Sequence, residues 1–173
     1  MNKRMILLLL AALLAGGARA EDAAKPPFDA GKYPAGVQKA LGYASEECKA
    51  NNGGEAIFAA GTVTTLDLTG DGRDDYIIQF GDTKCAAGSR AVFCGSGGCL
   101  INIMVTLSSG QVRKVFDGYV RSYDIRPDPS KPAHGPRTIG FELHGAYCGG
   151  HGSPSCPRDK RITTEPFEFR MPK

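Results

Sequence analysis

Six cysteines constrain the fold of this chain more than any other feature. An even number of cysteines in an exported chain predicts a disulfide framework. Short loops close at a lower entropic cost than long ones. We therefore predict that Cys94 pairs with Cys99 and Cys148 with Cys156, which leaves Cys48 and Cys85 as the third pair. The third bridge closes the longest loop, so it restricts the unfolded chain most.

The N-terminus supplies the reason to expect an oxidising compartment. It begins Met-Asn-Lys-Arg, continues with an apolar run from Met5 to Leu14, and reaches Ala18-Arg19-Ala20. That order is typical of a secretory signal peptide with its cleavage site. A membrane-spanning helix needs about 20 apolar residues, and this run is much shorter. We expect residues 1–20 to be a signal peptide and the working protein to be periplasmic or secreted, with no membrane span.

The predicted signal peptide also explains the apparent basicity of the chain. The whole sequence has 21 Lys and Arg against 18 Asp and Glu, a net charge of +3. Lys3, Arg4 and Arg19 account for that excess, so the rest of the chain is formally neutral. A nucleic-acid-binding domain usually carries a basic stripe. We therefore expect no nucleic-acid partner.

The apolar pattern predicts a single α+β domain over residues 36–173, preceded by a flexible N-terminal arm over 21–35. Apolar residues recur at helical spacing between Val37 and Cys48, and Asn51-Asn52-Gly53-Gly54 ends the helix. Short β-type runs follow, each bounded by turn residues: 57–68, 76–80, 100–107, 111–116, 119–126, 138–143 and 162–170. We expect one antiparallel sheet with the helix packed on it, stapled by disulfides; an all-β sandwich is the alternative.

The stretch Asp-Leu-Thr-Gly-Asp-Gly-Arg-Asp-Asp, residues 67–75, is the most specific motif. Oxygen ligands at alternate positions, a glycine and a later acid form the pattern with which a loop wraps Ca²⁺. The ligands would be the side chains of Asp67, Thr69, Asp71 and Asp75 and the carbonyl of Arg73. Threonine at the second ligand position predicts a weak site. The alternative is a metal-free hairpin turn held by Asx-type hydrogen bonds and by its glycines.

This loop resembles the D-x-[DN]-G-D-G-x-x-D loop of FG-GAP and VCBS-type repeats, in which calcium sits in a β-hairpin turn. Those repeats occur in tandem as propeller blades, whereas this chain has one copy. Together with the signal peptide, the segment from Phe93 to Cys99 and a late His-Gly…Cys segment, the loop also resembles a group of small exported proteobacterial proteins of unknown function. The first resemblance implies calcium, and the second implies no activity.

Two further sets of residues allow a reactive interpretation. His144, Cys148, His151 and Cys156 have the residue types of a zinc site, but export favours a Cys148–Cys156 disulfide with two solvated histidines. A nucleophilic set of Ser96, His144 and Asp124 can be assembled only without a recognisable motif around the serine. For these reasons we do not predict an enzyme.

Three tyrosines, Tyr119, Tyr123 and Tyr147, form a candidate binding face, although the spacing of four between the first two also suits ordinary sheet packing. We expect an exported, non-enzymatic binding or structural module. It would contact a protein or envelope component through the loops around Cys94–Cys99 and Cys148–Cys156. The alternative is a small exported hydrolase that uses the His144/His151 region.

Overall fold

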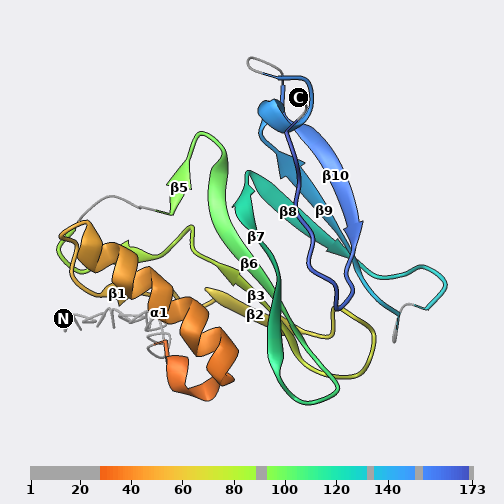
Figure 1. The fold of residues 1–173 in the computed structure, drawn as a ribbon, viewed down its shortest axis with the longest axis horizontal. Coiled ribbons are helices and arrows are strands. Elements are labelled where there is room, and N and C mark those ends of the chain that lie inside the picture. Colours follow the sequence, from red (N-terminus) through yellow and green to blue (C-terminus); the bar gives the residue numbers. More distant parts are fainter. Residues whose placement is uncertain (1–27, 89–92, 132–134, 151–153, 172–173) are drawn as a thin grey trace, which may run out of the picture.

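The computed structural model describes residues 28–88, 93–131, 135–150 and 154–171 (Figure 1). The predicted signal peptide lies outside these residues. The described chain contains one long helix, α1 (Ala35–Ala50), and a short 3-10 helix before it, η1 (Ala30–Lys32). One face of α1 is buried, and it carries the residues whose spacing predicts the helix: Val37, Leu41, Ala44 and Cys48.

The strands form three antiparallel sheets within the described chain, where the sequence predicts one. In the largest sheet β6 lies in the middle and pairs with β3, β5 and β7, while β2 pairs with β3. Its strands are β2 (Val63–Leu66), β3 (Asp75–Gln79), β5 (Cys94–Gly95), β6 (Gly98–Thr106) and β7 (Val112–Val120). The smallest sheet joins β1 (Ala56–Ile57) to β4 (Lys84–Cys85).

The third sheet has the order β8-β9-β10 and is continuous in sequence with β7. It consists of β8 (Ser122–Arg126), β9 (Thr138–Leu143) and β10 (Cys156–Arg161), with a 3-10 helix, η2 (Gly145–Tyr147), after β9. Figure 1 shows α1 on one side of the large sheet and β8–β10 on the other. One helix and several antiparallel sheets give a mixed architecture in which strands predominate.

The alternation of side chains along β6 produces two hydrophobic cores. Leu100 and Met104 point toward α1 and belong to the helix-side core, whereas Ile101, Ile103 and Val105 point toward the third sheet and belong to the sheet-side core. The helix-side core also contains the buried α1 residues and Val63, Tyr76, Ile78 and Phe80. The sheet-side core also contains Leu68, Ile77, Val115, Phe116, Val120, Ile139, Phe141, Leu143 and Ile162.

A β-bulge in β7 enlarges the sheet-side core. The pairing shifts between Ile103, which faces Phe116, and Met104, which faces Lys114, so Val115 has no partner on β6. The extra residue lets two consecutive side chains, Val115 and Phe116, enter the same core. The Phe116 ring lies over Gly118, where a Cβ would be 2.9 Å from the ring.

Three cysteine pairs lie at disulfide distance, and they are the pairs that loop length predicts. The Cα–Cα separations are 5.5 Å for Cys48–Cys85, 4.0 Å for Cys94–Cys99 and 6.0 Å for Cys148–Cys156. The first links the end of α1 to β4, the second closes the β5–β6 turn, and the third joins the end of η2 to the start of β10. The described part of the chain has no free cysteine.

Residues 28–35 fall within the predicted flexible arm, and the structure describes how they pack. The Phe28 ring lies 5.8 Å from Tyr33 and 5.2 Å from Phe58, and Tyr33 meets Tyr76 edge-on at 6.2 Å. These aromatic contacts attach the segment to the helix-side core, although half of its residues are proline, glycine or charged. None of the helices the structure describes has the length and apolar character needed to cross a membrane.

Candidate functional site

The Asp67–Asp75 loop is organised around the fully buried carboxylate of Asp75. One of its oxygens accepts a hydrogen bond from the Thr106 backbone N–H at 2.8 Å. The other accepts from the N–H groups of Leu68 (2.9 Å) and Thr69 (3.0 Å) and from the Thr69 hydroxyl (3.2 Å). Burial raises the pKa of this carboxyl group, and the hydrogen bonds act in the opposite direction.

Asp67 and Asp71 also accept hydrogen bonds within the loop. Asp67 accepts from the backbone N–H groups of Gly70 (2.6 Å), Asp71 (3.1 Å) and Gly72 (2.9 Å). Asp71 accepts from the Arg73 N–H and forms an ion pair with the Arg73 guanidinium at 2.5 Å. Gly70 and Gly72 have positive φ angles of 76° and 82°, which is why glycine occupies these positions.

Two distant elements clamp the loop. The Arg73 Nε donates to the Thr106 carbonyl at the end of β6, at 3.3 Å. Ahead of β9, the Arg137 side chain donates to the Asp67 carbonyl at 3.0 Å, and the Arg137 N–H donates to the Leu68 carbonyl at 2.8 Å. The loop therefore ties the large sheet to the third sheet.

In this arrangement the side chains that the sequence assigns to calcium accept hydrogen bonds from the protein. A carboxylate offers about four lone-pair sites, and all four hydrogen bonds at Asp75 point into the protein. Three backbone N–H groups donate to the Asp67 carboxylate in the same way. No cluster of three or more metal-ligating side chains occurs within the described ranges. The geometry resembles the hydrogen-bonded turn that is the alternative, and calcium binding stays a prediction.

The candidate zinc residues are placed differently from a metal site. Cys148 and Cys156 form a disulfide, so neither offers a thiolate. The His144 Nδ1 accepts a hydrogen bond from the Ala146 N–H at 3.2 Å and so caps η2. His151 lies outside the described residues.

The structure does not bring the candidate nucleophilic set together. Asp124 lies opposite Gly140 on β9 and forms an ion pair with Arg126 at 2.9 Å. His144 follows Gly140, the partner of Asp124, by four residues. At the rise per residue of a strand, these four residues span about 13 Å along the chain. Asp124 therefore orients an arginine and not the histidine.

The two short disulfide loops lie at the same end of the molecule, at the top of Figure 1. On the large sheet, Cys99 pairs with Val120. On the third sheet, Leu143 pairs with Cys156. Between them Arg121 donates its N–H to the Glu142 carbonyl at 2.9 Å, and its guanidinium lies 3.4 Å from the Ser96 carbonyl. We call the Cys94–Cys99 turn, Tyr119, Arg121 and the described part of the Cys148–Cys156 segment the disulfide end.

The three candidate tyrosines do not form one exposed face. Tyr119 is 45% exposed and lies beside the Cys94–Cys99 turn, with its Cβ 3.7 Å from a Cβ placed on Gly97. Tyr123 and Tyr147 instead pack against the sheet-side core. Tyr43 on α1 is 48% exposed and was not predicted to take part. Its position near Tyr119 depends on packing between distant elements, which helical spacing alone does not reveal.

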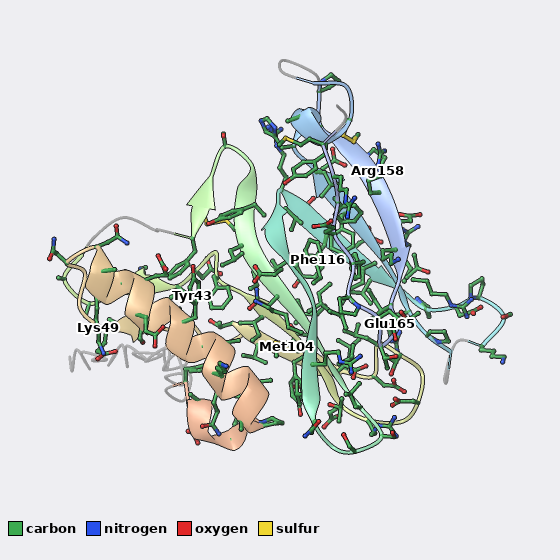
Figure 2. All side chains as sticks on the ribbon, viewed as in Figure 1. Tyr43, Lys49, Met104, Phe116, Arg158 and Glu165 are labelled. Carbon is green, nitrogen blue, oxygen red and sulfur yellow. A yellow bond between two sulfur atoms is a disulfide. The ribbon has the colours of Figure 1, made fainter. Side chains whose placement is uncertain are left out.

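A groove between α1 and strands β6 and β7 is a second feature that the sequence does not predict. Asn102 on β6 is 4% exposed and lines this groove between Leu100 and Met104. The sequence feature that could have indicated the groove is Asn102, the polar residue in the otherwise apolar run from Leu100 to Val105. Figure 2 shows Tyr43 and Met104 in the region between α1 and the central strands.

Comparison with known proteins gives no match to this chain among family models, curated proteins or solved structures.

Proposed function

We propose that this protein is an exported, non-enzymatic binding module that contacts a protein or envelope component through its disulfide end. The observation that supports the proposal is that two short disulfide loops lie on either side of Arg121. Its side chain contacts the Ser96 carbonyl in one loop, and its backbone N–H donates to the Glu142 carbonyl near the other. Each loop is covalently closed, and each is next to a paired strand. A surface fixed in this way loses little conformational entropy when it binds, so more of the contact energy appears as affinity.

The exposed residues of the disulfide end are of the types that dominate binding surfaces. Tyr119 is nearly half exposed, and Arg121 is exposed at the corner between β7 and β8. Tyrosine and arginine are enriched among the residues that contribute most to protein–protein affinity. Ser96 and Gly95 are also exposed in the turn and expose backbone polar groups beside these two side chains.

Site-specific photocrosslinking in the exporting cell tests this proposal. A photoreactive phenylalanine analogue replaces Tyr119 in one variant and Ile57 in the other. Ile57 is a matched control because it is 55% exposed and lies on β1, away from the disulfide end. We expect a discrete crosslinked product from the Tyr119 position, and its loss when Arg121→Glu is added. Equal products from both positions, or none from Tyr119, would overturn the proposal.

No contact in the described chain favours the hydrolase alternative. His144 is engaged in capping η2, and Asp124 is engaged by Arg126. We therefore propose no catalytic role for the His144 region. A hydrolase screen on the wild type and on His144→Ala tests this directly, because activity lost in the variant would restore the alternative.

Calcium binding by the Asp67–Asp75 loop stays a prediction of the sequence, with a separate test. A ligand that binds only the folded state raises the free energy of unfolding, and with it the melting temperature, as the logarithm of one plus the ratio of ligand concentration to Kd. If calcium binds, melts in millimolar calcium and in EDTA differ, and Asp71→Ala removes the difference. If the loop is a hydrogen-bonded turn, the two melts coincide.

A further inference from the structure

The groove between α1 and strands β6 and β7 has the dimensions and lining of a small-molecule site. Its volume is about 430 Å³, within the usual range for ligand pockets of about 300–1,000 Å³. The helix contributes Lys39, Ala40 and Tyr43, and the floor comes from β6. Val112 and Lys114 form the side that belongs to β7. The groove adjoins the disulfide end, since Leu100 on its floor pairs with Tyr119. Its lining contains none of the residues that carry the function proposed above, so the inference does not rest on that function.

The floor of the groove combines apolar side chains with one buried amide. Leu100 is 7% and Met104 is 4% exposed, and Asn102 lies between them on the same face of β6. No hydrogen bond joins the Asn102 carboxamide to any group in the described structure, and its polar atoms reach the groove, because the Thr83 hydroxyl is the one completely buried side-chain polar group without a partner among the described residues. Its donor and acceptor groups are therefore open to whatever occupies the groove. A polar group of a ligand that enters the groove would satisfy them.

The charges at the rim indicate the sign of that polar group. Lys114 and Asp117 form an ion pair on β7 and neutralise each other. Lys39 on α1 has no ion-pair partner in the described chain, so the groove carries one uncompensated positive charge. An anion is therefore favoured over a cation at this rim.

We propose that this groove binds a medium-chain fatty acid or a carboxylic acid of the same shape. The aliphatic chain lies on Leu100, Met104 and the Ala40 side of α1, where it removes apolar surface from water. The carboxylate accepts a hydrogen bond from the Asn102 carboxamide and interacts with Lys39. One occupant thus satisfies the apolar floor, the unpaired amide and the uncompensated lysine.

Calorimetric titration with three ten-carbon probes tests the proposal: decanoate, decanol and decyltrimethylammonium, all kept monomeric. Decanoate should bind about tenfold more tightly than decanol, because a hydrogen bond to a charged group contributes more than a neutral one. The ammonium probe should bind most weakly. Equal affinity for decanoate and decanol, or no binding of decanoate at millimolar concentration, would overturn the proposal.

Two variants separate the contributions of the amide and the lysine. Asn102→Leu should weaken decanoate about tenfold while decanol binds as well as before or better, because the floor becomes wholly apolar. Lys39→Gln should weaken decanoate about threefold, as expected for a partly exposed ion pair. The matched control is Lys84→Gln, which removes an exposed lysine on β4 outside the groove and should leave affinity unchanged.

A spectroscopic measurement protects the test against a variant that fails to fold. In the wild type, the Asn102 side-chain NH₂ resonance should shift when decanoate is added, and side-chain amides outside the groove should not. Asn51 offers a control, because its side chain already donates to the Glu47 carbonyl at 2.8 Å. Shifts at Asn51 and not at Asn102 would contradict the proposed position of the carboxylate.

Discussion

The two faces of the large sheet are covered in different ways. On one face the third sheet and the segment after it close a cluster of phenylalanines, in which Phe116 lies 5.2 Å from Phe141 and 5.0 Å from Phe167. On the other face a single helix covers the sheet and leaves a groove whose floor includes the Asn102 carboxamide. Figure 2 shows Phe116 on the side of β7 toward the third sheet, opposite the side where Tyr43 lies.

The difference teaches that one strand can serve stability on one side and recognition on the other. Ile101 and Ile103 are buried in the sheet-side core, whereas Asn102 between them lines the groove. We call the face of the large sheet that the third sheet covers the closed face, and the face that α1 covers the helix face. The helix face combines a covalent tether, Cys48–Cys85, with a groove between α1 and the sheet. We expect stability to depend mainly on the closed face and binding on the helix face.

The largest test of this comparison removes an aromatic side chain from the closed face. Phe141→Ala should lower the free energy of unfolding by about 4 kcal/mol, because Phe141 is 1% exposed and its loss leaves a cavity among rings that cannot collapse fully. Tyr43→Ala on the helix face is the control and should change it by less than about 0.5 kcal/mol. Chemical denaturation followed by circular dichroism suits a chain without tryptophan. Similar costs for both variants would remove the distinction between the faces.

The second test releases the covalent tether of the helix face. Cys48→Ala with Cys85→Ala should cost about 3 kcal/mol, since the bridge closes a long loop in the unfolded chain. The cysteines are 37 residues apart, against 8 for Cys148–Cys156, so removing the latter pair should cost less. Hydrogen exchange should then accelerate in α1 while β9 stays protected. Equal acceleration in both elements would show that the faces unfold together.

The sequence predicts the parts of this fold that depend on local pattern. The buried face of α1 follows from helical spacing, and the disulfide pairs follow from loop length. The number of sheets does not follow, because the corner at Arg121 separates β7 from β8 within an almost continuous β-type run. The bulge at Val115 is equally hidden, since only pairing with β6 reveals it.

The candidate sites were predictable to different degrees. The composition of the Asp67–Asp75 loop marks it as special, but the sequence leaves open whether its carboxylates face a metal or the backbone. The structure directs Asp75 toward N–H groups from the loop and from Thr106, which is 31 residues away. The groove was not predictable, because it exists only where α1 leaves part of β6 and β7 uncovered.

The third test concerns the Asp67–Asp75 loop, which ties the large sheet to the third sheet. Asp75→Asn places an NH₂ group where one oxygen accepts backbone hydrogen bonds, and at least one buried N–H then lacks a partner. The expected cost is about 2 kcal/mol. Asp74→Asn is the matched control at an exposed neighbour and should change stability by less than about 0.5 kcal/mol. A small cost for Asp75→Asn would mean that the loop relaxes without loosening either sheet.

The smallest expected effect is a difference in the pH dependence of stability between Asp75 and Asp128, a carboxylate at the edge of the closed face. Asp128, beyond β8, accepts hydrogen bonds from Ser130 and pairs with Arg161 at 2.9 Å. The Ser130 hydrogen bonds, with Arg161 and Lys131 nearby, lower the pKa of Asp128. A lowered folded-state pKa gives stability that is present above the unfolded pKa of about 3.9 and is lost as pH falls through the folded value.

The pH dependence of stability at Asp75 has the opposite sign, because burial raises the pKa of its carboxyl group in the folded protein. Its contribution is therefore greatest below the unfolded pKa of about 3.9 and declines as pH rises through the folded value. Denaturation between about pH 7 and pH 3 should show the advantage of wild type over Asp128→Asn shrinking as pH falls. The advantage over Asp75→Asn should grow over the same interval. If both shrink, the four hydrogen bonds to Asp75 outweigh its burial, and the loop is held by its charge.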